Sequence, residues 1–474
     1  MIRQITSLLL VTLSSLFIST LAAAEEPALP SGLGDEPMLP SGRNSTDLPE
    51  LPMGISENTA DDRDVEDTAW EEDKTWQING FWEARWGEWT HAQTFLSRHP
   101  LAENRVQLSV ERAFDKVTLN VSGDLLYDKT VAFEKPDLES GNGWLDLRVA
   151  NLVFSPSPFM DIRLGRQILT WGMGDLVFIN DLFPKDWNAF LIGRESSYLK
   201  APSDAIKISL FSKQANLDIV YTPRFDSDRY INGERAAYFN ANLGRIAGTD
   251  AVIRTEKPDR WLNDQEIAIR LYRNFSAFEF ALYGYEGYWK SPGGFNADTG
   301  NAVFPGLRVY GASFRGPWLK GIVSGEWGYY YSKDDTNGSK PFINNSEQRL
   351  LLTYEQELVS NLTLALQVYS VRMLNYSRYR KNLPEGIPSA QEDRHELSMR
   401  LTWLTINQKL NTSLFIRYSP SDKDIYLRPK LRYSLDDHWS YEVGGNIFYG
   451  TESYTFFGQF DKNDNIYAAI RYGL

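Results

Sequence analysis

RLGRQILTWGMGDLVFINDLFPKDWNAF, residues 163–190, decides the fold, because a regular alternation of side chains ends inside it. In residues 160–165 apolar side chains alternate with polar ones or glycine, which is the pattern of a β-strand with one apolar face. After Gly165 this period of two is lost, and Gly172 and Gly174 allow backbone conformations that other residues avoid. The stretch therefore predicts a strand that continues into a long, irregular loop.

The same period of two recurs from Trp76 to the C-terminus, with apolar residues on one face of each segment and polar residues on the other. In the first segment, for example, Trp82 and Trp86 alternate with Glu83 and Arg85. A soluble β-sandwich would alternate in the same way, so the alternation alone does not identify the fold. The connections between the segments decide it.

Short and long connections alternate along the chain. Short ones include Phe114–Lys116 and Leu435–His438. Tight turns at one rim and long loops at the other are typical of an outer-membrane β-barrel. The long connections are predicted at Arg166–Ser203, Thr222–Asp264, Glu286–Gly306, Tyr331–Ser346 and Arg372–Asp393.

The number of strands follows from parity. If both ends of the barrel lie on the periplasmic side, the number of strands is even. Placing residues 456–460 within a final outer loop, Tyr449–Asp464, gives about eighteen strands, and sixteen is the nearest alternative. The prediction is an all-β protein, a transmembrane antiparallel β-barrel that occupies residues 76–474.

Two segments precede the barrel. Residues 1–24 have a basic start, an apolar core and three alanines, and they predict a signal peptide cleaved after Ala24, which favours the outer membrane of a Gram-negative cell. Residues 25–75 are acidic and rich in proline and glycine, and they predict a disordered periplasmic tail. LPSG occurs twice in this tail, at 29–32 and 39–42, so a docking peptide for a periplasmic protein is an alternative to a plain linker.

Catalytic chemistry is not indicated. The chain has no cysteine, and its four histidines have no metal-ligand spacing. No nucleotide-binding motif occurs either. The sequence therefore predicts no enzyme activity, no catalytic residue, no cofactor, no metal site and no nucleic-acid partner.

The long loop 166–203 is predicted to fold into the barrel and narrow it, as loops of porins commonly do. Its charged residues are candidates for the pore constriction, with its tryptophans packing the loop. The alternative is that the same residues only anchor the loop by salt bridges to the wall. The candidates are Arg166, Trp171, Asp175, Asp181, Lys185, Asp186, Arg194 and Glu195.

Basic residues gather on the inward faces of the strands toward the C-terminus. A cationic wall in a narrow pore raises the local concentration of anions. The alternative is that these cations are solvated or paired with acidic loop residues, which also agrees with a net charge of -13. The predicted basic wall consists of Arg400, Arg417, Arg428, Lys430, Arg432 and Arg471.

Several motifs carry a family likeness. RLGRQILTWG with FINDLFPKDW, YTPRF at 221–225 followed by GERAAYFN, and TFFGQFDKND near the C-terminus resemble an uncharacterised group of porin-like outer-membrane barrels of Gram-negative bacteria. That group is similar in layout to alginate-export and phosphate-selective porins. The resemblance covers most of residues 76–474 and implies the barrel fold.

These observations together predict a porin-like channel for the passive passage or export of small polar solutes, with anions as candidates, or of a polymer. The hypothesis from another class is a non-conducting barrel that acts as the outer-membrane partner of a periplasmic export or lipid-trafficking assembly, docked through the tail 25–75. The expected surroundings are outer-membrane lipid and lipopolysaccharide. Monomer and homotrimer both remain open.

Overall fold

A computed structural model describes residues 76–91, 93–130 and 135–474. The predicted signal peptide, the predicted tail and its LPSG repeats lie outside the described residues. Among the described residues, no helix is long and apolar enough to cross a membrane.

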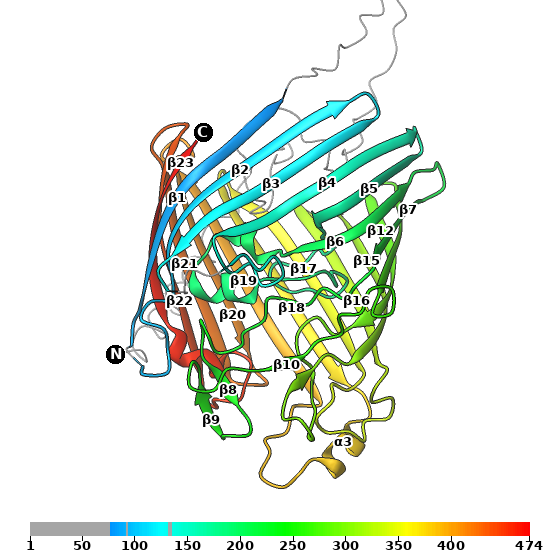
Figure 1. Cartoon of the computed structure of the whole chain (residues 1–474), viewed down its shortest axis with the longest axis vertical. Coiled ribbons are helices and arrows are strands. Elements are labelled where there is room, and N and C mark those ends of the chain that lie inside the picture. Colours follow the sequence, from blue (N-terminus) through cyan, green and yellow to red (C-terminus); the bar gives the residue numbers. More distant parts are fainter. Residues whose placement is uncertain (1–75, 92, 131–134) are drawn as a thin grey trace, which may run out of the picture. The chain divides into compact units, whose positions relative to one another are not determined.

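Eighteen antiparallel strands form one closed sheet, because the first strand pairs with the last as well as with the second. Figure 1 shows these strands running obliquely around the barrel. The predicted strand number is therefore confirmed. The strands are β1 (Gln77–Trp89), β2 (Ala102–Phe114), β3 (Val117–Asp128), β4 (Leu145–Ser157), β5 (Met160–Ile168), β6 (Pro202–Leu210), β7 (Asn216–Thr222), β11 (Glu266–Phe275), β12 (Phe278–Tyr288), β15 (Gly306–Trp318), β16 (Gly321–Ser332), β17 (Glu347–Val359), β18 (Leu362–Met373), β19 (Asp393–Thr405), β20 (Leu410–Ser419), β21 (Asp424–Ser434), β22 (Trp439–Gly450) and β23 (Asn465–Gly473).

Shorter elements lie in the long connections. A two-stranded sheet lies within the connection from β7 to β11, and a three-stranded sheet joins that connection to the one from β12 to β15. Figure 1 shows several of these elements gathered near one end of the barrel. The elements are α2 (Trp187–Ile192), η1 (Ser196–Leu199), β8 (Tyr238–Asn240), β9 (Arg245–Ala247), β10 (Thr255–Glu256), β13 (Gly294–Phe295), β14 (Ala302–Val303), α3 (Tyr376–Asn382) and η2 (Gly458–Asn463).

The alternation of the sequence sorts side chains between the inside and the outside of the barrel. On β1, Glu83 and Arg85 are only 4% and 3% exposed, whereas Ile78 and Trp86 are 65% and 44% exposed. Exposed apolar side chains continue on the same outward face of the other strands, as at Leu108, where lipid would cover them. All backbone groups of such a closed sheet can pair with a neighbouring strand, which a membrane requires.

The connections between the strands agree with the predicted ones, with small shifts in their bounds. The final loop contains η2 and no strand, so the parity argument is confirmed there. Loop 166–203 is shorter than predicted: β5 continues to Ile168 and β6 begins at Pro202, so the loop comprises residues 169–201. The connections from β1 to β2 and from β3 to β4 are also long, which the prediction missed.

Candidate functional site

Loop 169–201 lies inside the barrel. Its helix α2 begins where the Asp186 carboxylate accepts a hydrogen bond from the Ala189 amide at 2.8 Å, and it ends at Gly193, whose φ of 90° is left-handed. An acidic cap and a left-handed glycine are the usual signals for a short helix. The loop therefore has a defined path between its contacts with the wall.

The first half of the loop is held by two wall strands, β16 and β19. The Glu326 carboxylate on β16 accepts hydrogen bonds from the amides of Met173 at 2.6 Å and Asn180 at 3.1 Å. Asp175 forms an ion pair with Arg400 on β19, with Nη2 and Oδ1 at 2.7 Å. Because its base contacts β16 and its tip contacts β19, this half spans part of the lumen.

The second half of the loop is held by β1, β2 and β21. Arg194 donates from Nε to Glu103 on β2 at 2.8 Å, and both side chains are buried. Arg85 on β1 donates to the Gly193 carbonyl at 2.9 Å. Glu195 pairs with Arg432 on β21 at 3.1 Å.

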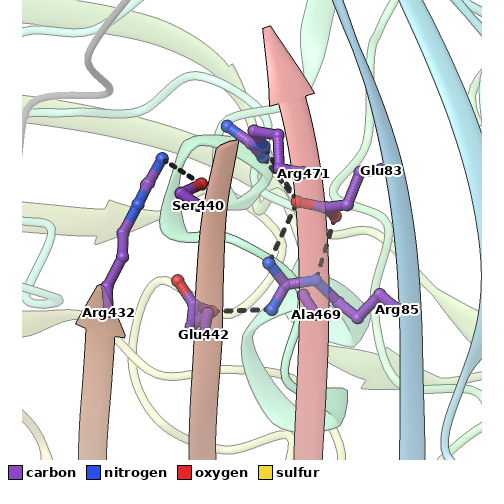
Figure 2. A pocket seen from close by; sticks show the side chains of 7 residues that line it. All are labelled: Glu83, Arg85, Arg432, Ser440, Glu442, Ala469 and Arg471. Atoms are coloured by element: carbon purple, nitrogen blue, oxygen red, sulfur yellow. Dashed lines mark hydrogen bonds and ion pairs between the residues drawn. The ribbon is translucent and has the colours of Figure 1, made fainter. Parts of the chain in front are cut away.

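Figure 2 shows the wall beside this contact, where β1, β21, β22 and β23 line a small cavity. Arg85 bridges Glu83 at 3.0 Å and Glu442 at 2.7 Å. Arg471 reaches Glu83 at 2.7 Å and also pairs with Glu195 of the loop. The arginines of this wall therefore face carboxylates rather than open solvent.

Apolar packing fills the space around the ion pairs. Trp171 packs its ring on Phe183 at 4.9 Å between centroids, within a first apolar cluster shared with β6 to β18. Phe190 packs on Tyr426 of β21 at 5.1 Å, within a second cluster. Loop 169–201 contributes to both clusters, so it has its own buried core inside the barrel.

Two further loops pack against this one. In the loop between β7 and β11, Arg229 pairs with Asp146 on β4 at 2.8 Å, and Asp228 accepts from the Trp187 indole at 2.9 Å. In the final loop, Asn463 accepts from the Ala237 amide at 2.9 Å and so connects these two loops. These insertions were not predicted, because neither segment has a periodic pattern.

The lumen is filled at the level of these loops. Each of the eighteen strands contributes at least one inward side chain that is less than 10% exposed. The inward face of every strand is thus partly covered by packed side chains. One such residue from each strand, in order, is Glu83, Arg105, Asp124, Arg148, Gln167, Ala205, Val220, Ala268, Tyr283, Val309, Glu326, Leu351, Gln367, Glu396, Phe415, Tyr426, Glu442 and Tyr467.

Arg166 was predicted as a constriction residue of the loop, but the structure places it near the end of strand β5. It belongs to β5, on the same outward face as Leu164, which is 51% exposed. Its guanidinium pairs with Asp204 at 3.0 Å and donates to the Leu147 carbonyl at 2.6 Å. The alternation of β5 continues three residues beyond Arg163, and this places Arg166 outside the lumen.

The other loop candidates do lie inside the barrel, but each has its own partner. Asp181 bonds Lys185 at 2.9 Å, Asp186 caps α2, and Asp175 pairs with Arg400. Among the described residues, no group of three histidine or acidic side chains is arranged to hold a metal ion. The partners of these loop residues lie within the loop or on the wall, which favours the anchoring alternative.

The residues of the predicted basic wall also contact the loop or nearby carboxylates. Arg417 pairs with Glu396 and donates to the Leu176 carbonyl at 3.1 Å. Arg428 donates to the Arg194 carbonyl at 3.3 Å, and Lys430 interacts electrostatically with Glu442. Arg400, Arg432 and Arg471 pair with Asp175, Glu195 and Glu83. This arrangement favours the anchoring alternative for the arginines, while an anion preference stays a prediction.

Tyr198 of η1 is buried inside the barrel. Arg105 and Arg148 lie over its ring, with guanidinium carbons 4.0 and 4.7 Å from the centroid. Burial raises the pKa of the Tyr198 phenol well above its usual range. The phenol is therefore neutral. Its ring helps to hold two arginines of the wall, and the sequence analysis had not predicted that these arginines contact the loop.

Gly193→Ala is expected to lower the free energy of unfolding by more than about 1 kcal/mol, because alanine resists a φ of 90° and the site has no space. A Cβ at Gly193 would lie 2.2 Å from a ring carbon of Tyr467. Urea unfolding of the refolded protein in lipid vesicles measures the change. Gly244→Ala is the control, since its φ of 62° is also left-handed but no atom lies within 4 Å of its added Cβ.

Fold and site together define a class: a transmembrane antiparallel β-barrel whose lumen contains packed loops. The chain is similar in structure to Acinetobacter baumannii OccAB4, with a TM-score of 0.50 and 11% identity over 84% of this chain and 97% of that one. The outer membrane protein opdK from Pseudomonas aeruginosa matches with a TM-score of 0.49 and 8% identity, over 84% of this chain and 99% of that one. At 11% identity the likeness to OccAB4 concerns the barrel fold alone.

No protein-family model and no curated protein sequence matches the chain. The resemblance to alginate-export and phosphate-selective porins therefore remains a prediction from the motifs.

Proposed function

We propose that this protein is an outer-membrane channel for small polar solutes, with loop 169–201 as its constriction and with the described conformation closed. The observation that carries the proposal is the way the loop is held: charged side chains of β19 and β2, which lie six strands apart around the sheet, bind it inside a barrel whose inward faces carry many polar side chains. Asp175 with Arg400 and Arg194 with Glu103 are the two ends of this attachment. A barrel with polar inward faces can conduct water and ions once the constriction opens.

The proposed location rests on the apolar outward face of the barrel and on residues 1–24, which read as a signal peptide cleaved after Ala24. Sequencing the N-terminus of the protein from an outer-membrane fraction tests both points. A chain that begins at Met1, or one found in another fraction, would contradict them.

Single-channel recording in a planar bilayer tests conduction. We expect brief openings and a reversal potential, under a salt gradient, that favours anions, because Lys430 and its neighbouring arginines line the wall. Lys430→Glu changes the local charge by two units and is expected to move the reversal potential toward cation preference. Lys423→Glu, in the turn between β20 and β21 and exposed, is the matched control and should leave selectivity unchanged.

The packed lumen favours a second candidate function: a barrel that does not conduct and acts as a partner in a periplasmic assembly. Its basis is that two apolar clusters fill the lumen with loop residues such as Phe190 and Ile179. A protein that never opens at any voltage supports this candidate and contradicts the channel. Deleting residues 25–74 then tests whether the tail provides the docking site.

A further inference from the structure

One part of loop 169–201 is attached less firmly than the rest. We call residues 172–180 the strap. Gly172 is exposed and Met173 to Asp175 are half-buried, whereas Ala189 to Arg194 in the second half are all buried. The loop thus combines a buried segment, residues 189–194, with a segment at the start of the strap, residues 172–175, that remains accessible to solvent.

The backbone of the strap is under local strain. Leu176 has a φ of 58°, in the left-handed region that residues with a side chain rarely occupy. Gly174 beside it tolerates no side chain, since a Cβ there would lie 2.4 Å from the Val177 carbonyl oxygen. Such a conformation persists only while neighbouring contacts hold it.

The contacts that hold the strap differ at its base and at its tip. At the base, Glu326 is 2% exposed and accepts hydrogen bonds from Met173 and from the amide and the side chain of Asn180. The base is therefore fixed in a dry environment on β16.

The tip of the strap contacts two other strands. Asp175 reaches across to Arg400 on β19, and Arg417 on β20 donates to the Leu176 carbonyl at 3.1 Å. The tip is therefore fastened to β19 and β20.

The Asp175–Arg400 ion pair at the tip is the most solvent-exposed ion pair of the loop. The Asp175 side chain is 29% exposed, compared with 10% for Glu195, 3% for Asp186 and 1% for Asp181. Its partner Arg400 is 17% exposed. Ion pairs in contact with water contribute about 1 kcal/mol or less, far less than it costs to break a buried pair. When the loop moves, this pair should therefore separate first.

We propose that the strap is the gate of the channel and that the Asp175–Arg400 ion pair is its clasp. This inference rests on the proposed channel function. Opening separates the clasp, lets Leu176 leave the left-handed region, and swings the tip away from β19 about the base at Glu326. Residues 181–201 stay in place, since buried ion pairs such as that of Arg194 with Glu103 hold them.

Asp175→Asn removes one charge of the clasp and keeps the shape of the side chain. We expect the open probability in planar bilayers to rise about fivefold, as the loss of one half-exposed ion pair implies. The matched control is Glu279→Gln, which breaks the ion pair with Arg270, 2.7 Å long with side chains 24% and 17% exposed, between two wall strands. An unchanged open probability in Asp175→Asn, or an equal rise in Glu279→Gln, would overturn the proposal.

A chemical measurement tests the motion without relying on conduction. The chain has no cysteine, so a single cysteine can be introduced and labelled with a charged methanethiosulfonate reagent. Val177 in the strap is 4% exposed, and Val309 on β15, in the same apolar cluster, is 1% exposed. In the Asp175→Asn background we expect Val177→Cys to react about fivefold faster, again from the loss of one half-exposed pair, and Val309→Cys to react at its original rate.

Failure of the gate and failure of the channel are distinguishable in these experiments. If every variant conducts but the labelling rate of Val177→Cys is unchanged, the gate proposal is contradicted and the channel proposal is not. Faster labelling without any conduction would support the moving strap and contradict the channel. Equal acceleration at Val309→Cys would mean that the whole insert loosens, which contradicts a local gate.

Discussion

Glu103→Leu is expected to lower the free energy of unfolding by about 3 kcal/mol, because removing one member of a buried ion pair leaves its partners uncompensated. Glu103 is 3% exposed and lies within ion-pair distance of Arg194 at 2.5 Å, Arg105 at 3.1 Å and Arg235 at 3.8 Å. Leucine has a similar volume but cannot accept a hydrogen bond. Equilibrium unfolding in urea, followed by tryptophan fluorescence in lipid vesicles, measures the loss.

A double variant shows whether charge is the cause. Glu103→Leu with Arg194→Met removes both members of the central pair and should recover part of the stability, since no charge of that pair remains buried alone. The remaining arginines keep other carboxylates, Arg105 that of Asp124 and Arg235 that of Asp128 at 2.6 Å. If the double variant is less stable than Glu103→Leu alone, packing rather than charge explains the effect.

The barrel could be predicted from the sequence because its determinants are local. A strand with one face in lipid and one face in the lumen must alternate, so Glu83 and Arg85 were placed inside without any knowledge of their partners. Parity of the strand number then decided between a strand and a loop for residues 456–460, and η2 occupies the end of that segment. Arg166 was placed in the loop because the alternation was not followed far enough along the chain. Continuing it two residues past Leu164 puts Arg166 on the outer face of the barrel.

The contents of the barrel could not be predicted in the same way, because they depend on pairs far apart in the chain. Arg85 contacts Glu442, 357 positions away, and the Ala237 amide contacts Asn463 across 226 positions. No period or spacing in the sequence reports such a contact. The sequence did indicate that loop 169–201 carries charges and tryptophans suited to packing, but which wall residue each one meets follows from the closure of the sheet.

The sequence analysis missed the role of Glu326, although the pattern of strand β16 contains a signal for it. It is a carboxylate on the inward face of β16, between Ser324 and Gly328, where no basic residue alternates with it. A lone inward carboxylate needs donors from elsewhere, and here they are backbone and side-chain N–H groups of the strap. Unbalanced inward charges are therefore useful predictors of where an inserted loop attaches.

Tyr426→Ala is expected to lower the free energy of unfolding by about 3–5 kcal/mol, the range for deleting a large aromatic side chain from a packed core. Tyr426 is fully buried, and its ring lies 4.7 Å from that of Phe448, 5.1 Å from Phe190 and 5.5 Å from Phe457. These rings come from the wall, from loop 169–201 and from the final loop. Alanine would leave a cavity at the point where all three meet, and the same urea unfolding assay measures the loss.

Tyr426→Phe separates the ring from its hydroxyl group. Phenylalanine keeps the aromatic contacts and removes only the hydrogen bond from the Tyr426 hydroxyl to Asn446 at 2.7 Å, which corresponds to about 1 kcal/mol. The second apolar cluster also holds Leu176 of the strap. Because Leu176 must leave this cluster when the strap opens, Tyr426→Ala should raise the open probability as well as lower stability, whereas Tyr426→Phe should do little of either. Equal stability of the two variants would mean that the loops are held by their ion pairs alone, and that the aromatic contacts only fill space.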